Sequence, residues 1–373
     1  MTRLVRACAA TCAAIVGMAF FASAAEALPA KFWGVVAQAS PTAEQLQRLH
    51  RGGVQSIRIP FEWASVQPVA GGALNWSGVD VAVGHAVAAG IDVLPFLNGA
   101  PTWAVPAAPV PGTGGAARAP VRLPATGAAA TAWKAFLRGA VERYGPGGAF
   151  WAANPSLPER PIRAWQIWNE ENFKYFVARP NPAEYGNLVK ISSPAIKSVD
   201  PGAKVVLGGL FARPIEATQG FKPPRAYFAT DFLEQMYEKT PGVKAKFNGI
   251  GLHPYTYRYQ SLTPDIEAVR EVLKANHDPG KGIWITELGW SSSSPDAGDG
   301  FAKGPKGQVT QLKGAFSLLK RNQAKWKVQR VYWFSVDDKP GACNFCDGSG
   351  LFSAGFKPKK SWFEYVRFAG GTP

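Results

Sequence analysis

Two glutamates, Glu170 and Glu287, occupy sequence positions that are typical of catalytic carboxyl groups. Each follows a short apolar and aromatic run: Glu170 closes Trp-Gln-Ile-Trp-Asn-Glu, and Glu287 closes Ile-Trp-Ile-Thr-Glu. Such runs are typical of buried strands, and a carboxyl group at a strand end can reach a ligand. Two carboxyl groups that face each other can serve as acid and nucleophile, which is what cleavage of a glycosidic bond requires.

Eight short runs with strand composition predict how these glutamates are positioned. They span 32–38, 56–61, 92–97, 162–168, 204–210, 249–253, 283–287 and 330–336. Segments with helical spacing of apolar residues lie between them, at 43–51, 130–144, 183–198, 230–239, 264–275 and 308–321. Eight strand-helix units without a Gly-x-Gly-x-x-Gly fingerprint favour a single-domain α/β fold, a closed (β/α)8 TIM barrel. Glu170 and Glu287 would then end the fourth and seventh strands and face one mouth.

The connection after the third strand run is much longer than the others. Its residues 105–129 are mostly Pro, Gly and Ala, with Arg118 and Arg122 among them. Because such loops ring the C-terminal mouth of a barrel, this one is either a wall or lid of a binding cleft or a surface excursion. Composition leaves both interpretations open.

The order and placement of the two glutamates resemble the clan A glycoside hydrolases, which are (β/α)8 enzymes that retain anomeric configuration. In that clan the acid/base glutamate follows an Asn on strand four, as in Asn169-Glu170, and the nucleophile ends strand seven, as Glu287 does. The Gly-x-His-Pro-Tyr and Pro-x-Trp-Ala pieces look most like the family 39 and family 5 branches. The resemblance covers nearly all of residues 28–373 and implies a β-glycoside hydrolase that acts on a poly- or oligosaccharide by double displacement.

The resemblance also implies residues that support the pair. Arg58 on strand two and Tyr255 would keep Glu287 ionised, although a buried structural ion pair with Arg58 is the alternative. Asn169 would hold the sugar 2-hydroxyl, and His253 would give polar support or serve as a structural donor.

Three further residues are candidate contacts to the sugar. Trp333 on strand eight matches a clan Trp that could stack on the sugar ring, and Trp103 lies at a strand end as a possible platform. Asn98 stands near strand three, where family 5 carries a His.

The N-terminal segment predicts export. Arg3 and Arg6 precede an apolar stretch over residues 7–22 and an Ala-Glu-Ala pattern, so residues 1–27 are predicted to be a signal peptide and 28–373 the barrel domain of a secreted protein. A retained N-terminal anchor is the alternative. No later segment approaches the roughly 20 uninterrupted apolar residues of a membrane span. In an exported protein Cys343 and Cys346 predict a disulfide, with a redox pair or half a zinc site as alternatives.

Composition and net charge limit the classes of binding partner that the sequence predicts. A chain of 373 residues with 46% hydrophobic content can bury one large core. The formal net charge of +15 comes from scattered Lys and Arg, so it predicts either a merely soluble basic surface or selection of an anionic polysaccharide. We expect no nucleic-acid partner, no metal or organic cofactor and a monomer. A non-hydrolytic carbohydrate-binding barrel and a metal-dependent barrel hydrolase are the rival functions.

Overall fold

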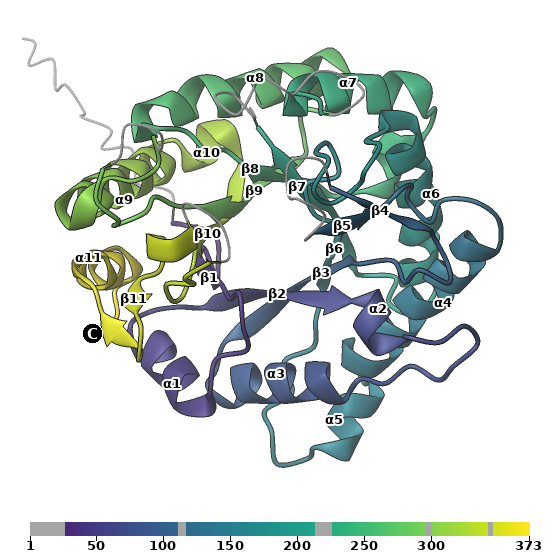
Figure 1. The fold of residues 1–373 in the computed structure, drawn as a ribbon, viewed down its shortest axis with the longest axis horizontal. Coiled ribbons are helices and arrows are strands. Elements are labelled where there is room, and N and C mark those ends of the chain that lie inside the picture. The colour runs from purple at the N-terminus through teal and green to yellow at the C-terminus, as the bar shows by residue number, and fades with distance from the viewer. Residues whose placement is uncertain (1–26, 111–116, 213–225, 296–299, 342–345) are drawn as a thin grey trace, which may run out of the picture.

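Eight parallel strands close into a barrel, in the order β1-β10-β9-β8-β7-β6-β3-β2, with helices around the outside (Figure 1). This computed structural model describes residues 27–110, 117–212, 226–295, 300–341 and 346–373. Successive barrel strands along the chain are neighbours in space, so each strand-helix unit adds one strand to the barrel wall and one helix to the outer layer. The predicted (β/α)8 fold is confirmed.

The barrel strands follow the predicted runs, and no strand end differs from its prediction by more than two residues. They are β1 (Trp33–Val36), β2 (Ser56–Glu62), β3 (Asp92–Asn98), β6 (Ala164–Ile167), β7 (Lys204–Phe211), β8 (Gly249–His253), β9 (Gly282–Leu288) and β10 (Val328–Phe334). Short strand pairs outside the barrel are β4 (Ala107–Pro109) with β5 (Arg118–Pro120), and β11 (Phe352–Ser353) with β12 (Lys357–Pro358). All residues of β8 and β9 are buried, as expected for strands covered on both faces.

Helices form the outer layer. They are α1 (Ala43–Arg51), α2 (Trp63–Val66), α3 (Ser77–Ala88), α4 (Gly127–Tyr144), α5 (Ala149–Ala153), α6 (Pro182–Lys197), α7 (Ala229–Lys239), α8 (Leu262–Ala275), α9 (Gly304–Arg321), α10 (Gln323–Trp326) and α11 (Lys360–Ala369). The α3 helix was not predicted, because its Gly and β-branched Val residues have low helix propensity. Its buried face, Val83, Ala86 and Val87, shows that packing against the barrel stabilises it.

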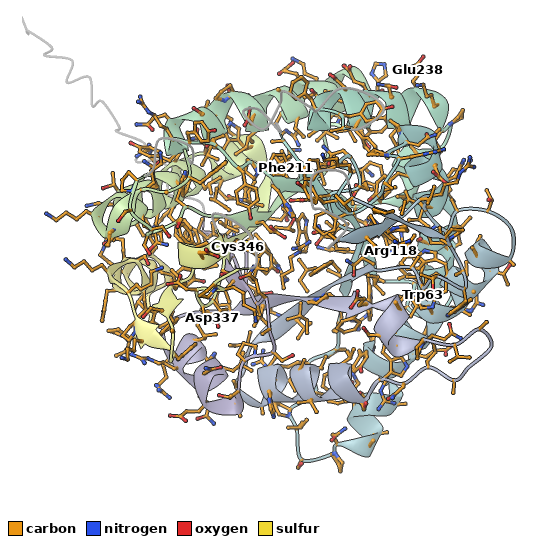
Figure 2. The ribbon with its side chains drawn as sticks, viewed as in Figure 1. Trp63, Arg118, Phe211, Glu238, Asp337 and Cys346 are labelled. Carbon is orange, nitrogen blue, oxygen red and sulfur yellow. The ribbon has the colours of Figure 1, made fainter. Side chains whose placement is uncertain are left out.

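Side chains alternate between two apolar clusters along each strand. On β10, Val331 and Trp333 belong to the large cluster between barrel and helices, whereas Tyr332 and Phe334 belong to the smaller cluster inside the barrel. Figure 2 shows Phe211, at the end of β7, beside the barrel strands and Glu238 of α7 at the outer edge of the molecule. Alternation therefore decides which side chains can reach the barrel axis.

Part of the long loop after β3 forms the small β4-β5 hairpin. Residues 111–116 of this loop lie outside the described residues, so its role as a wall or lid stays a prediction. Among the described residues, no helix combines the length and apolar character needed to cross a bilayer.

Candidate active site

Arg58 lies at the centre of a buried polar network at the C-terminal end of the barrel. Its side chain is fully buried, and its three nitrogens donate to three acceptors: Nη1 to Glu287 Oε1 (2.6 Å), Nη2 to Asn169 Oδ1 (2.6 Å) and Nε to Gln166 Oε1 (2.7 Å). The guanidinium carbon also lies 4.0 Å from the centroid of the Phe96 ring. One cation on β2 thus contacts side chains from β3, from β9, and from β6 and the turn that follows it.

Glu287 accepts a hydrogen bond at each carboxylate oxygen. Besides Arg58 at Oε1, the Tyr255 hydroxyl donates to Oε2 at 2.7 Å. Burial raises the pKa of Glu287, while the charge of Arg58 and the Tyr255 hydrogen bond oppose that rise. These two donors favour the ionised carboxylate.

Glu170 has a different environment. Its Oε1 lies 2.7 Å from His253 Nδ1, and the other imidazole nitrogen, Nε2, lies 3.1 Å from Thr286 Oγ1. Burial and the charge of Arg58 hold the pKa of His253 well below its usual range, so the ring is neutral. Burial, followed by the negative charge of Glu287, raises the pKa of Glu170 well above that of a free carboxyl. Of the two glutamates, Glu170 is therefore the one that keeps a proton.

The two carboxyl groups are close together and reach solvent to a small extent. One oxygen of Glu170 and one of Glu287 lie within 4.8 Å of each other, and one ring nitrogen of His253 lies within 4.8 Å of both. The side chains of Glu170 and Glu287 retain 8% and 11% exposure. The pair is thus at the barrel mouth and not sealed in the core.

The backbone before Glu170 is twisted into an uncommon conformation. Trp168 and Glu170 have φ angles of 72° and 43°, in the left-handed region that residues other than glycine seldom occupy. This turn directs Glu170 toward the barrel axis directly after β6. Such outliers concentrate at functional sites, because surrounding structure must hold them.

A protein-family comparison agrees with this geometry. Residues 166–363, which run from the end of β6 into α11 and include both glutamates, match the family described as glycosyl hydrolase catalytic core. The chain belongs to this family.

Solved structures show that this glycosyl hydrolase shares its fold with other glycosidases. A family 39 glycoside hydrolase from Bacteroides cellulosilyticus WH2 superposes with a TM-score of 0.63 at 18% identity, covering 91% of this chain and 64% of that one. A monomeric beta-xylosidase from Caulobacter crescentus CB15 superposes with a TM-score of 0.60 at 18% identity, and the match covers 91% of this chain and 68% of that one. A GH53 catalytic domain from Ignisphaera aggregans superposes with a TM-score of 0.57 at 18% identity, and the match covers 92% of this chain and 98% of that one. The chain thus spans less than two thirds of the family 39 chain and nearly all of the GH53 domain.

Two predicted sugar contacts of this glycosyl hydrolase lie outside the Arg58 network. Asn98 ends β3, where it pairs in register with Glu62, and its Oδ1 is buried without a hydrogen-bond partner among the described residues. Trp103 is partly buried, donates from Nε1 to Gln67 O (2.9 Å) and packs edge-on against Trp63. Neither contacts the glutamates in the described structure, and their sugar-binding roles stay predictions.

The prediction for Trp333 is wrong. Its side chain is fully buried, donates from Nε1 to Ser349 O (3.0 Å) and packs against Trp290 and Phe316 in the layer between barrel and helices. The adjacent Phe334 points into the barrel instead and lies edge-on to Tyr255, with ring centroids 6.3 Å apart. An apolar strand with aromatics on both faces conceals which residue faces the axis.

Sequence reasoning missed Gln166 and Thr286. Gln166 Nε2 donates to Leu207 O (3.1 Å) and to Thr286 Oγ1 (3.2 Å), so these residues join the Arg58 side of the network to His253. Both are polar residues inside otherwise apolar strands, and that signal was available in the sequence. A buried polar side chain needs partners, so it predicts a network around it.

Two glycines of β7 make room for this network. A Cβ atom on Gly208 would lie 1.8 Å from Glu171 Oε2, and one on Gly209 would lie 1.8 Å from His253 Nε2. The glycines thus allow a buried carboxyl group on one side and the site histidine on the other to reach the strand backbone.

The predicted disulfide cannot be placed, because Cys343 lies outside the described residues. Cys346 is buried in the turn Cys346–Gly348. The pairing stays a prediction.

Glu170, His253 and Glu287 also form a geometrically possible metal site, since one ligand atom of each lies within 4.8 Å of the others. The donor set does not favour a divalent cation. Both oxygens of Glu287 already accept hydrogen bonds, and the Arg58 cation lies 2.6 Å from one of them. A metal ion would meet this positive charge and would displace the Tyr255 hydrogen bond.

Proposed function

We propose that this glycosyl hydrolase is exported and cleaves O-linked β-glycosidic bonds of a poly- or oligosaccharide with retention of configuration. Glu287 attacks the anomeric carbon while protonated Glu170 donates its proton to the leaving oxygen. Glu170 then takes a proton from the water that hydrolyses the glycosyl-enzyme intermediate. The observation that carries the proposal is the unequal environment of two adjacent carboxyl groups: two donors, one of them cationic, face Glu287, whereas a neutral His253 faces Glu170.

The short separation of the two carboxyl groups supports retention. Retaining enzymes place these groups about 5 to 5.5 Å apart, whereas inverting enzymes need roughly 6.5 to 9.5 Å to admit a water molecule. An oxygen-oxygen separation within 4.8 Å falls on the retaining side.

Asn169 is the proposed donor to the sugar 2-hydroxyl. Because its Oδ1 accepts from Arg58, its Nδ2 is left to donate, and among the described residues this nitrogen has no protein partner. Hydrogen bonds to the 2-hydroxyl strengthen toward the transition state, so Asn169 would lower the barrier to glycosyl transfer.

The test is the response of Glu170→Gln to leaving-group ability. Loss of the acid should abolish turnover of alkyl glycosides but spare the glycosylation step of activated aryl glycosides. Added azide, which needs no general base, should then restore aryl turnover and yield the β-glycosyl azide. Glu287→Ala should be inactive on both substrates.

Glu238→Gln is the matched control, because it makes the same chemical change on an exposed residue of α7. It should behave as the unaltered protein. Equal loss of both substrate classes in Glu170→Gln, without azide rescue, would contradict the assignment. NMR of the first-formed product should show the β-anomer; an α-anomer would contradict retention.

Substrate and export need their own measurements. A panel of aryl β-xylosides and β-glucosides, plant β-glycans and acidic bacterial exopolysaccharides, scored by reducing-end release, would identify the sugar. A beta-xylosidase among the similar structures makes β-xylosides a reasonable start. Binding of oligosaccharide without any reducing ends would select the non-hydrolytic alternative. Intact mass of the exported protein should correspond to a chain starting at Leu28.

A further inference from the structure

A cavity lies at the end of the barrel opposite the two glutamates. Its volume is about 360 Å³, and its lining comes from the first three positions of the strands and from residues shortly before them. Asp92 and Lys204 begin β3 and β7, Arg163 directly precedes β6, and Arg330 is the third residue of β10. Glu170 instead follows β6, and Glu287 lies near the end of β9. The barrel interior therefore separates the two sites.

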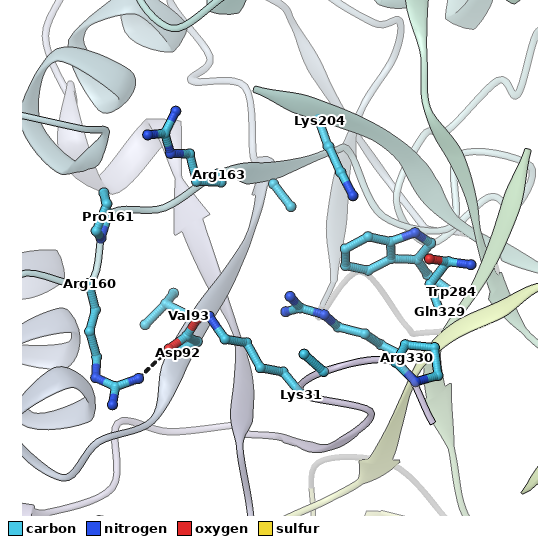
Figure 3. Close-up of a pocket in the computed structure, with 13 residues that line it drawn as sticks. Lys31, Asp92, Val93, Arg160, Pro161, Arg163, Lys204, Trp284, Gln329 and Arg330 are labelled. Atoms are coloured by element: carbon cyan, nitrogen blue, oxygen red, sulfur yellow. Dashed lines mark hydrogen bonds and ion pairs between the residues drawn. The ribbon is translucent and has the colours of Figure 1, made fainter. Parts of the chain in front are cut away.

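The cavity lining is strongly basic. Five cations and one acid contribute to it: Lys31, Arg160, Arg163, Lys204 and Arg330, with Asp92. Figure 3 shows these side chains around the cavity, with the ion pair between Arg160 and Asp92 at 2.7 Å. Lys31 also pairs with Asp92, so one carboxylate serves two cations. Arg163 has a partner outside the lining, Asp200, at 3.1 Å.

Lys204 and Arg330 have no carboxylate partner in the described part of the chain. The nearest acceptors of Arg330 Nη1 are the hydroxyls of Ser56 and Tyr332, at 3.3 and 3.4 Å. Its guanidinium also lies 4.9 Å from the ring centroid of Trp284, whose buried indole forms part of the lining. Arg330 is thus held in place by neutral groups, and its charge is left unmatched.

The neighbouring cations disfavour the charge on Lys31. Burial lowers the pKa of Lys31, and the charges of Arg330 and Arg160 lower it further. Repulsion of this kind at a concave surface with a low-dielectric wall produces a local positive potential that an anion would relieve.

We propose that this cavity is a binding site for a small ligand that carries a carboxylate or phosphate group. Arginine forks and lysine ammonium groups are the usual partners of both anions. The volume is at the lower end of the range of about 300 to 1,000 Å³ for small-molecule sites, which suits one sugar acid or one phosphorylated small molecule. Asp92, the one acid in the lining, is already paired with two cations, so the site is suited to binding and not to catalysis.

The test is calorimetric titration at low ionic strength with three probes: inorganic phosphate, glucuronate and uncharged glucose. Phosphate, glucuronate or both should bind, and the affinity should fall as salt is added. Binding of glucuronate alone assigns the site to an acidic sugar, and binding of phosphate alone assigns it to a phosphorylated ligand. Absence of binding by both anions, or equal binding of glucose, would overturn the proposal.

Variants locate the bound anion. Lys204→Gln/Arg330→Gln should weaken anion binding by about tenfold or more, because two charged donors are lost. Lys204→Gln alone changes an exposed residue and should weaken binding in the same direction, even where the double variant folds poorly. Lys320→Gln/Arg321→Gln, an exposed pair at the end of α9, is the matched control and should bind as the unaltered protein does.

Glycoside turnover separates this site from the proposed active site. The double variant should keep the turnover of the unaltered protein on an aryl glycoside, while Glu287→Ala should keep anion binding. Unchanged anion affinity in Lys204→Gln/Arg330→Gln would show that the anion binds elsewhere and would overturn the assignment to this cavity.

Discussion

Removing one hydroxyl group, in Tyr255→Phe, should shift the pH dependence of the enzyme. The Tyr255 hydroxyl donates a hydrogen bond to Glu287 Oε2 at 2.7 Å, and in the proposed mechanism Glu287 must be ionised to attack. A hydrogen bond to a charged group is worth about 1.5 to 3 kcal/mol, and one unit of pKa corresponds to about 1.4 kcal/mol. The pKa of Glu287 in the free enzyme should therefore rise by about one to two units in the variant.

The sign follows from the role of Glu287. A higher pKa means that protonation inactivates the nucleophile at higher pH, so the acidic limb of kcat/KM should move upward by about one to two pH units. The alkaline limb, which in the proposed mechanism reports loss of the Glu170 proton, should move much less. The assay is kcat/KM on an activated aryl glycoside across pH.

Tyr237→Phe is the matched control, because Tyr237 also donates to a carboxylate, Asp278, at 2.9 Å, but lies on α7 away from the barrel mouth. Its profile should superpose on that of the unaltered protein. An acidic limb that stays in place in a well-folded Tyr255→Phe variant would refute the assignment of Glu287 as the group that titrates there.

Three further outcomes follow from the same network. Arg58→Gln should lower the free energy of unfolding by about 3 to 5 kcal/mol in urea titrations, because it leaves the buried carboxylate of Glu287 without its cation; a loss below about 1 kcal/mol would mean that the pair is only weakly coupled. Burial raises the pKa of Glu171 to about 8 from 4.5, so the folded state keeps a proton that the unfolded state loses, and stability should fall as pH rises from about 4.5 to 8. Glu171→Gln should reduce that fall, and an identical pH dependence in both proteins would contradict it. Prolonged EDTA treatment should leave turnover unchanged; activity lost to EDTA and restored by a divalent metal would revive the metal-dependent alternative.

Much of the site could be predicted from residue type and strand position. The two glutamates, Asn169 and Arg58 lie at or within strands whose runs are readable, and parallel strands of a barrel must bring their ends together. The closed barrel itself follows from eight strand-helix units. These inferences hold because they need only the order of elements along the chain.

Side-chain direction could not be predicted in the same way. Trp333 and Phe334 are both large and apolar, so their sequence pattern does not show which one faces the barrel axis. The left-handed backbone at Trp168 and Glu170 carries no glycine or asparagine signal, and tertiary packing imposes it. The basic cavity was also hidden, because its cations come from separate strands and meet only once the barrel has closed.

The glycine pair of β7 limits how the substrate range of this enzyme can change. At Gly208 and Gly209 any side chain would collide with Glu171 or with His253, so saturation mutagenesis should recover almost nothing but the parent codons at these two positions. Adaptation to a new sugar must then use other parts of the mouth. Mutant libraries that aim to change substrate specificity should vary the loops after the other strands and leave Gly208 and Gly209 of β7 unchanged.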